Sequence, residues 1–276
     1  MRRAAAYAVT MKPSHRPLCP PRAVLLAIAL GASSAPAWAH DTWFEPLASP
    51  VGEVRFALGT GNRFPVTELA VDSKYFVKSG CRTAEGAEQA LEALRYTEKT
   101  TQLRTRADEA AQLSCFVQLA PFEFDLPADK IEIYFKEIRP SATVRATWAE
   151  LRARGLPFHE RYTKSARIDG ASAAPLPVGM AMDVLRTAPA GPLTVGSEAS
   201  FQVLREGQPL TDFNVELVNE RSPFGLWYRT DAQGRIRAKL PLPGRWLLRG
   251  TDLRLSTSDA TKWNSHFITY AFDVAR

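Results

Sequence analysis

Apolar and polar residues alternate along much of this chain with a period of two, which is the pattern of a strand half-buried on one face. In the stretch 54–58, Val54, Phe56 and Leu58 alternate with Arg55 and Ala57. The stretch 131–136 shows the same alternation. The pattern predicts a strand over each stretch.

Two segments have helical features instead. In residues 147–154, Thr147 and Glu150 have the spacing of a capping box, and Gly155 and Pro157 follow as terminators. A short helix is therefore expected there. The alanine- and glutamate-rich stretch 84–95 is a second helix candidate.

The carboxyl-terminal third repeats short strand patterns separated by Gly and Pro turns at intervals of about ten residues, the spacing of a β-sandwich. Expected strands cover 180–186, 199–204, 213–217, 236–240, 245–249 and 267–274. The Ala-, Pro- and Gly-rich stretch 169–192 suggests a boundary. We predict a mainly β protein of two sandwich-like domains, 40–188 and 189–276, with one or two short helices. The second domain is expected to fold alone.

The first 39 residues resemble a cleavable signal peptide. Five basic residues and no acid precede an apolar run at 23–32, and the segment ends in Ala37-Trp38-Ala39. The apolar run is too short to span a bilayer, which needs about 20 residues. We therefore predict export to the periplasm, a mature chain that begins at His40, and no membrane span after cleavage.

Cleavage changes the charge balance. The whole chain has 35 basic and 29 acidic residues. Without the five basic residues of the signal, the chain has 30 basic and 29 acidic residues. No basic excess remains to neutralise phosphates, so the composition argues against a nucleic-acid partner.

Two cysteines, Cys81 and Cys115, remain in the mature chain. An even pair in an oxidising compartment usually forms a disulfide. A metal site of two thiolates is the alternative, although no histidine is near either cysteine in the sequence.

His40 is the most informative candidate for chemistry. After cleavage its α-amino nitrogen and its imidazole Nδ1 can chelate one metal ion, and both nitrogens suit copper, nickel, cobalt and zinc. Asp41 could add an oxygen ligand. His159 and His266 are the other histidines of the mature chain and the remaining candidate ligands. His266 is in phase with Ile268, which also fits a partly buried structural histidine.

Other chemistry finds little support. Glu160, Arg161 and Lys164 fit an ion-pair cluster or, more commonly, a solvated face. The aromatic residues fit core packing better than a carbohydrate platform. The sequence has no G-x-S-x-G motif, no glycine-rich phosphate loop and no C-x-x-C motif, so we expect a protein without catalytic residues.

Several motifs together resemble known families. The stretches GQPLTDFNVELVN and TDAQGRIRAKLPLPGRWLLRG resemble the carboxypeptidase-regulatory or prealbumin-like module. Together with HDTWFEP, GTGNRFP, FHERYTKSAR and WNSHF, they resemble an uncharacterised periplasmic family labelled as a periplasmic component of cobalt/nickel transport. That resemblance implies a nickel or cobalt ligand, with copper a further option, and a membrane metal-uptake transporter as partner.

Three functional hypotheses follow. The first is a periplasmic protein that binds a transition metal and delivers it to a transporter. The second is a non-catalytic module of the cell envelope that binds a protein or glycan. The third is a copper oxidase in which His40 and a second histidine form a histidine brace.

Overall fold

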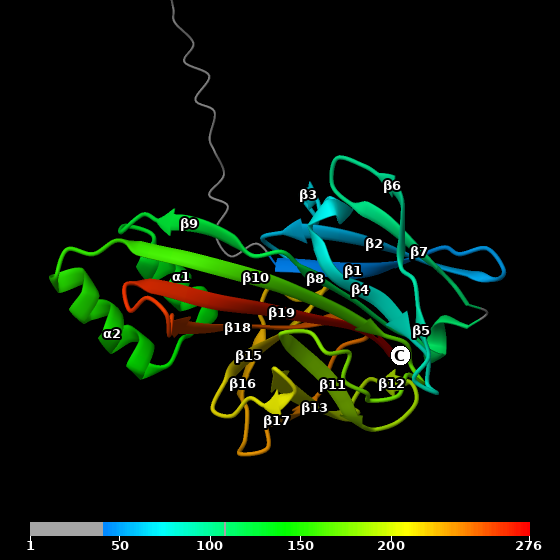
Figure 1. Cartoon of the computed structure of the whole chain (residues 1–276). Coiled ribbons are helices and arrows are strands. Elements are labelled where there is room, and N and C mark those ends of the chain that lie inside the picture. Colours follow the sequence, from blue (N-terminus) through cyan, green and yellow to red (C-terminus); the bar gives the residue numbers. More distant parts are fainter. Residues whose placement is uncertain (1–40, 108) are drawn as a thin grey trace, which may run out of the picture. The chain divides into compact units, whose positions relative to one another are not determined.

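A computed structural model of the protein describes residues 41–107 and 109–276, which belong to one compact unit. These residues form three β-sheets and two α-helices (Figure 1), with 3-10 turns η1 (Ser73–Tyr75) and η2 (Ala110–Gln112). The predicted mainly β, sandwich-like fold is confirmed. The predicted signal peptide and His40 lie outside the described residues.

The largest sheet has ten strands and contains both halves of the sequence. Its order is β16-β15-β18-β19-β10-β8-β4-β5, with β12 beside β19 and β9 beside β10. Its strands are β4 (Phe76–Arg82), β5 (Glu88–Gln89), β8 (Ser114–Leu119), β9 (Phe122–Leu126), β10 (Phe158–Asp169), β12 (Leu193–Thr194), β15 (Asn214–Asn219), β16 (Leu226–Arg229), β18 (Gly244–Leu255) and β19 (Lys262–Ala275). β10 and β19 run parallel from the pair His159 and Lys262 to the pair Ile168 and Ala271. This central sheet joins strands from both sides of residue 188, and the division into two domains stays a prediction.

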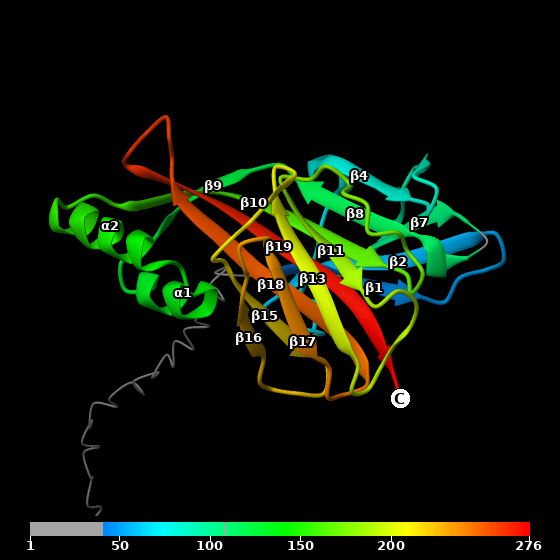
Figure 2. The same cartoon turned by 90° about the horizontal axis from the view of Figure 1, so that it is seen from below.

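Two smaller sheets pack on opposite faces of the central sheet. One contains β1 (Asp41–Leu47), β2 (Glu53–Gly61), β3 (Leu69–Ala70), β6 (Glu92–Tyr96) and β7 (Thr101–Arg106). The other contains β11 (Met182–Ala188), β13 (Glu198–Arg205), β14 (Gln208–Pro209) and β17 (Arg235–Lys239). Figure 1 shows β1 and β2 above the long strands, and Figure 2 shows β11 and β13 across their near side. We call the face that carries β1 the upper face and the other the lower face.

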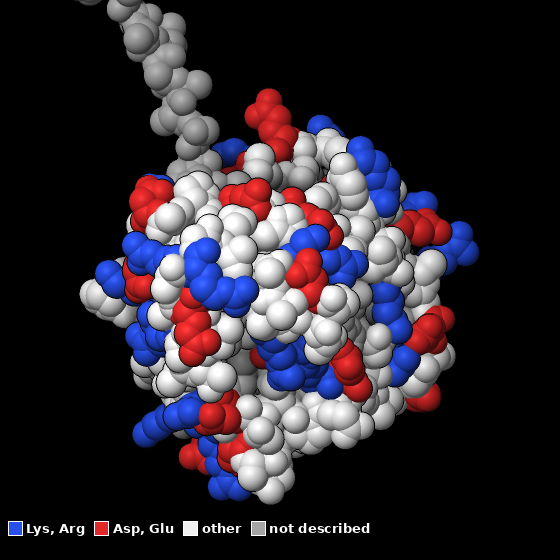
Figure 3. Space-filling view, turned by 60° about the vertical axis from the view of Figure 1, so that its left-hand side comes forward, with Lys and Arg blue, Asp and Glu red and all other residues white. Residues whose placement is uncertain are grey.

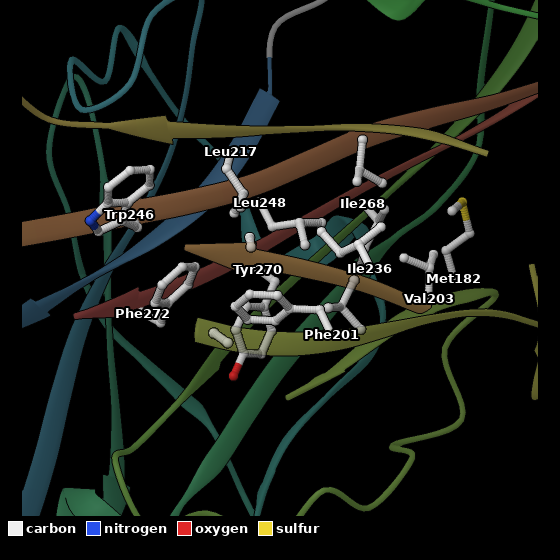
Figure 4. Close-up of a cluster of buried hydrophobic side chains, with 14 of the residues drawn as sticks. Met182, Phe201, Val203, Leu217, Ile236, Trp246, Leu248, Ile268, Tyr270 and Phe272 are labelled. Atoms are coloured by element: carbon white, nitrogen blue, oxygen red, sulfur yellow. The ribbon is translucent and has the colours of Figure 1, made fainter. Parts of the chain in front are cut away.

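The period-two pattern assigns alternate side chains of the central strands to two separate cores. On the lower face, Ile268, Tyr270 and Phe272 of β19 pack with Phe201 of β13 (Figure 4). On the upper face, Ala271 packs in a core with residues of β1 and β2, and with the cysteines of β4 and β8. Burial of Trp43, Phe44, Trp246 and Trp263 bears out the expectation of core packing for these four aromatic residues.

The predicted disulfide is confirmed. Cys81 of β4 and Cys115 of β8 are directly paired in the sheet and are bonded to each other. Both sulfur atoms are therefore consumed, which rules out the alternative of a two-thiolate metal site.

One predicted strand is wrong. Residues 131–138 form α1 (Ile131–Ile138) rather than a strand. Buried Ile131, Phe135 and Ile138 have the spacing i, i+4, i+7 of one helical face, whereas Ile133 is exposed. The short segment satisfies both periods, and packing on the upper face of the central sheet selects the helix.

The helix predicted at 84–95 is also wrong, because this stretch forms β5 and β6. β5 pairs with β4, and β6 pairs with β7 as an edge strand. All five residues of β6 are exposed, and Leu91 is the one buried residue of the stretch 84–95, so no extended side of this stretch packs on the core. Strand pairing overrides the helix propensity of Ala, Glu and Leu here.

The helix predicted at 147–154 is confirmed but begins earlier, as α2 (Ala142–Ala153). Its N-cap is Ser141, whose hydroxyl accepts a hydrogen bond from the Val144 N–H at 3.3 Å. Thr147 therefore lies inside the helix instead of capping it. Gly155, with φ of 75°, follows the end of the helix as predicted.

We expect Ser141→Ala to lower the free energy of unfolding by about 1 kcal/mol, because the Val144 N–H loses its acceptor. Urea unfolding of the mature protein measures the change. Thr147→Ala serves as the control, with an expected change below about 0.5 kcal/mol. A larger loss in Thr147→Ala than in Ser141→Ala would show that the cap lies at Thr147.

Candidate functional site: a buried polar cluster beside β1

Polar side chains collect on the upper face of the central sheet, between two hydrophobic cores. One core packs α1 and α2 against Phe158 and Trp263, and the other lies under β1 and β2. We call the polar residues between them the polar cluster: Asp41, Tyr134, Glu137, Glu160, Lys164, Glu216, Arg249 and Ser265. They come from β1, α1, β10, β15, β18 and β19.

Glu160 is the most deeply buried carboxylate of the polar cluster, with 1% of its surface exposed. Its Oε1 accepts hydrogen bonds from the Tyr134 hydroxyl, at 2.7 Å, and from the Ser265 hydroxyl. Its Oε2 is buried and has no hydrogen-bond partner among the described residues. Burial raises the pKa of Glu160 from its ordinary 4.5 to about 7, although both hydrogen bonds oppose the shift.

Lys164 is half-buried on the same face of β10 as Tyr162, and its Nζ lies 5.3 Å from the centroid of the Tyr162 ring. Burial lowers the pKa of Lys164 to about 8, while the charges of Asp41 and Glu160 act in the opposite direction. The charge of Lys164 is thus attracted both by Asp41 at the start of β1 and by Glu160 on β10.

Asp41 is fixed at the first residue of β1. Its Oδ2 accepts a hydrogen bond from Nη1 of Arg249 at 2.8 Å, and Nη2 of Arg249 lies 2.6 Å from Oε2 of Glu216. Burial works against the charge of Arg249, but the two carboxylates raise its pKa above the usual range. Glu137 of α1 also faces Asp41 and Arg249, and burial raises its pKa. Arg249 therefore holds the first described residue of β1 against the central sheet.

The polar cluster carries four carboxyl groups against two cationic groups. With all groups ionised, the cations leave two negative charges uncompensated. A partly desolvated site with excess negative charge favours a cationic ligand. Within the part of the chain that the structure describes, however, no three His, Cys, Asp or Glu side chains form a group that could hold a metal ion.

His159 lies on the lower face, away from the polar cluster. Its Nδ1 is 2.8 Å from Oδ1 of Asp125, and its Nε2 is 3.4 Å from Oε2 of Glu123. Both carboxylates belong to β9, whose antiparallel pairing with β10 sets Asp125 directly opposite His159. The structural role of His159 is therefore to pair with two carboxylates at the surface.

His266 also lies on the lower face, in phase with Ile268 as predicted, but in the interior of β19 and not at its start. Burial lowers its pKa, the charge of Arg205 acts in the same direction, and the charge of Asp252 opposes it. His159 of β10 pairs with Lys262 of β19. His266 is four residues further along β19, a distance of about 13 Å along the strand. The structure therefore brings neither histidine to the other or to Asp41.

For Glu160 and Lys164 the sequence left an ion-pair cluster and a solvated face open and favoured the solvated face, so their burial was missed. Both residues are in phase with the buried Phe158 and Ala166 on β10. That phase was the available signal, because a charged residue at a core position usually has a partner or a role. Arg161, out of phase, is exposed as expected.

The surface outside the polar cluster shows no large field of one sign on the face seen in Figure 3, where basic and acidic side chains are interspersed. Among the described residues, no helix is both long and apolar enough to cross a membrane. Fold and site together define a mainly β protein in which two small sheets share one central sheet and a buried polar cluster adjoins the first strand.

The chain belongs to the family DUF4198, described as a domain of unknown function, whose model matches residues 37–251. The match begins just before His40 and includes β1 and most of the central sheet. No curated protein matches the sequence.

Proposed function

We propose that the protein binds a first-row transition metal ion at the amino terminus created by removal of residues 1–39. Nickel or cobalt is the first expectation and copper the next. Delivery of the ion to a membrane metal-uptake transporter in the periplasm is the second part of the proposal. It rests on the resemblance to the family labelled with cobalt/nickel transport, as does the expected prealbumin-like module.

The position of Asp41 carries the proposal. Its carboxylate is locked to Arg249, and it lies in a polar cluster with excess negative charge. A metal chelated by the α-amino and imidazole nitrogens of His40 would be held one residue from this cluster. When all its groups are ionised, the net negative charge of the polar cluster would lower the electrostatic energy of a divalent cation there.

The structure changes the role we propose for Asp41. The sequence suggested an oxygen ligand, but Oδ2 of Asp41 accepts a hydrogen bond from Arg249. We therefore propose that Asp41 anchors the terminus and that the nitrogens of His40 supply the chelate. His159 and His266 lie on the lower face and are not proposed as ligands in this site.

Calorimetric titration of nickel and copper into correctly processed proteins tests the proposal. We expect His40→Ala and a variant with one glycine added before His40 each to weaken binding by at least about tenfold, or roughly 1.4 kcal/mol. The added residue keeps the imidazole but converts the amine into an amide, which is a poor ligand. His159→Ala is the matched control and is expected to bind like the native protein.

Two results would contradict the proposal. Equal binding by the native, substituted and extended proteins would place any metal site elsewhere. No binding by the native protein would favour the second hypothesis, a cell-envelope module without a metal. A copper oxidase would require, in addition, redox turnover by the copper-loaded native protein.

A further inference from the structure

A polar cavity of about 430 Å³ lies at the far end of β18 and shares no residue with the polar cluster. Its walls are the end of β18 (251–255), the connection between α1 and α2, and the loop 210–214. Its volume lies within the range of about 300–1,000 Å³ that is usual for ligand sites.

The wall formed by β18 is an unpaired strand edge. β15 pairs with β18 only from Trp246 to Arg249, and the described residues provide no second strand neighbour beyond that point. On its other side, β18 continues to pair with β19 as far as Leu255. Continuing this register places Asn214, the first residue of β15, opposite Thr251, so residues 252–255 have one free edge.

The hydrogen-bond alternation of antiparallel strands identifies which groups point to the free edge. Ser256 N–H donates to the Lys262 carbonyl, so Ser256 and every second residue before it bond to β19. Thr251, Leu253 and Leu255 then direct their N–H and C=O groups outward. Arg245, another odd-numbered residue of β18, accepts a hydrogen bond from the Glu220 N–H on the side away from β19. This bond agrees with the assignment.

Of these, Leu253 and Leu255 lie beyond the start of β15 and present four backbone groups with no protein hydrogen-bond partner among the described residues. Leu253 is a buried residue, at 4% exposure. The indole Nε1 of Trp263, which also lines the cavity, is buried and unpartnered as well. Buried backbone groups without partners are uncommon in native proteins, so this row of groups points to a ligand that supplies the partners.

The geometry of the row matches an extended peptide. Outward groups recur at every second residue, about 6.6 Å apart, which is the repeat of a second strand added to a sheet edge. The charged residues of the cavity wall are two arginines, Arg139 and Arg254, and two aspartates, Asp212 and Asp252. This balance favours an occupant without net charge, and Ile138 and Val144 offer apolar contacts.

We propose that the free edge of β18 is a docking site for an uncharged, extended peptide segment of a partner protein, bound by β-strand addition between β18 and the α1–α2 connection. This inference does not depend on metal binding, because it uses none of the residues of the polar cluster.

The experiment screens the mature native protein against a phage-displayed library of random heptapeptides and titrates the enriched peptides, made synthetically, by calorimetry. Thr147→Trp adds a bulky side chain to the cavity wall on α2, and we expect it to weaken peptide binding at least tenfold. Ala149→Trp, exposed on the same helix and outside the cavity wall, is the matched control and is expected to bind normally.

Two further measurements separate strand addition from other modes. Two versions of each peptide are compared, one N-methylated at its odd-numbered residues and one at its even-numbered residues. Only one version should lose binding, because only every second N–H group of an added strand bonds to the edge of β18. Leu255→Pro removes one outward N–H without removing a bond to β19, and it should weaken binding while the thermal transition remains cooperative.

The proposal is overturned if no peptide is enriched, or if enriched peptides bind Thr147→Trp and Ala149→Trp equally. Binding that survives N-methylation in both parities would also overturn it, because the cavity would then recognise side chains or small molecules rather than an added strand.

Discussion

Replacing Arg167 by Met is expected to lower the free energy of unfolding by about 3–5 kcal/mol, the usual cost of removing one partner from a buried ion pair. Arg167 lies on the lower face of β10 with none of its surface exposed. Nε donates to Oδ1 of Asp169 at 2.7 Å, and Nη1 donates to Oδ1 of Asp183 at 2.9 Å. The remaining donors reach Oδ2 of Asp169, the Leu176 carbonyl and the Ser114 hydroxyl.

All five N–H groups of the guanidinium are thus satisfied, and two carboxylates depend on one cation. Burial disfavours the charge of Arg167, yet Asp169 and Asp183 raise its pKa above the usual range. Burial also raises the pKa of Asp183, and the attraction of Arg167 opposes that shift. Without the guanidinium, two buried carboxylates would face each other with no countercharge, and this desolvation is the source of the expected loss.

Urea unfolding of the oxidised mature protein measures the effect. Arg237→Met, an exposed position on β17, is the matched control with an expected change within about 0.5 kcal/mol. The triple variant Arg167→Met, Asp169→Asn, Asp183→Asn should recover part of the stability, because it also removes the uncompensated charges. A loss below about 1 kcal/mol in Arg167→Met would mean that water already screens this network.

The fold class was predictable because much of it depends on local pattern. The strands of the carboxyl-terminal third appear where alternation and turns placed them, and Gly234 adopts the positive φ of 68° expected at the turn before β17. The disulfide between Cys81 and Cys115 also followed from their even count in a chain predicted to be exported.

The arrangement of the sheets was not predictable from local pattern. The parallel pairing of β10 with β19 joins residues about a hundred positions apart, such as Ser165 and Ile268. A single sequence carries no local signal for such pairing, and tertiary packing likewise decided between helix and strand at 131–138 and 84–95. A sequence that suggests two sandwiches in succession therefore folds with one sheet shared between them.

The candidate site was predictable only at its beginning. Asp41 was singled out because it follows His40, but its anchoring by Arg249 depends on residues more than 200 positions apart. Burial of Glu160 was hidden because the same strand also carries exposed charges, including Arg161. Charged residues in phase with the buried residues of a long strand are the sequence feature that indicates such a site.

The stability of the protein is expected to fall between about pH 4.5 and pH 7 because of Glu160. Its folded-state pKa of about 7 lies above the ordinary 4.5, so the folded state binds the proton more tightly than the unfolded state. The contribution is therefore fully present below pH 4.5 and is lost as the pH rises through 7. A shift of this size corresponds to about 3 kcal/mol. Lys164 changes the stability only between its folded-state pKa of about 8 and its ordinary pKa of 10.5. This pH range does not overlap the range of Glu160, from 4.5 to about 7.

Glu160→Gln isolates this term, because the amide oxygen can still accept the hydrogen bonds from Tyr134 and Ser265 while the side chain never ionises. We expect the variant to be more stable than the native protein by about 2–3 kcal/mol at pH 8 and similar to it at pH 4.5. Urea unfolding across this range measures both, and Glu150→Gln, exposed on α2, is the matched control. A native carboxylate that lowers stability at neutral pH is the pattern of a group retained for binding and not for folding. If the native protein and Glu160→Gln instead keep a constant difference at every pH, Glu160 does not titrate in this window and the polar cluster is a structural network.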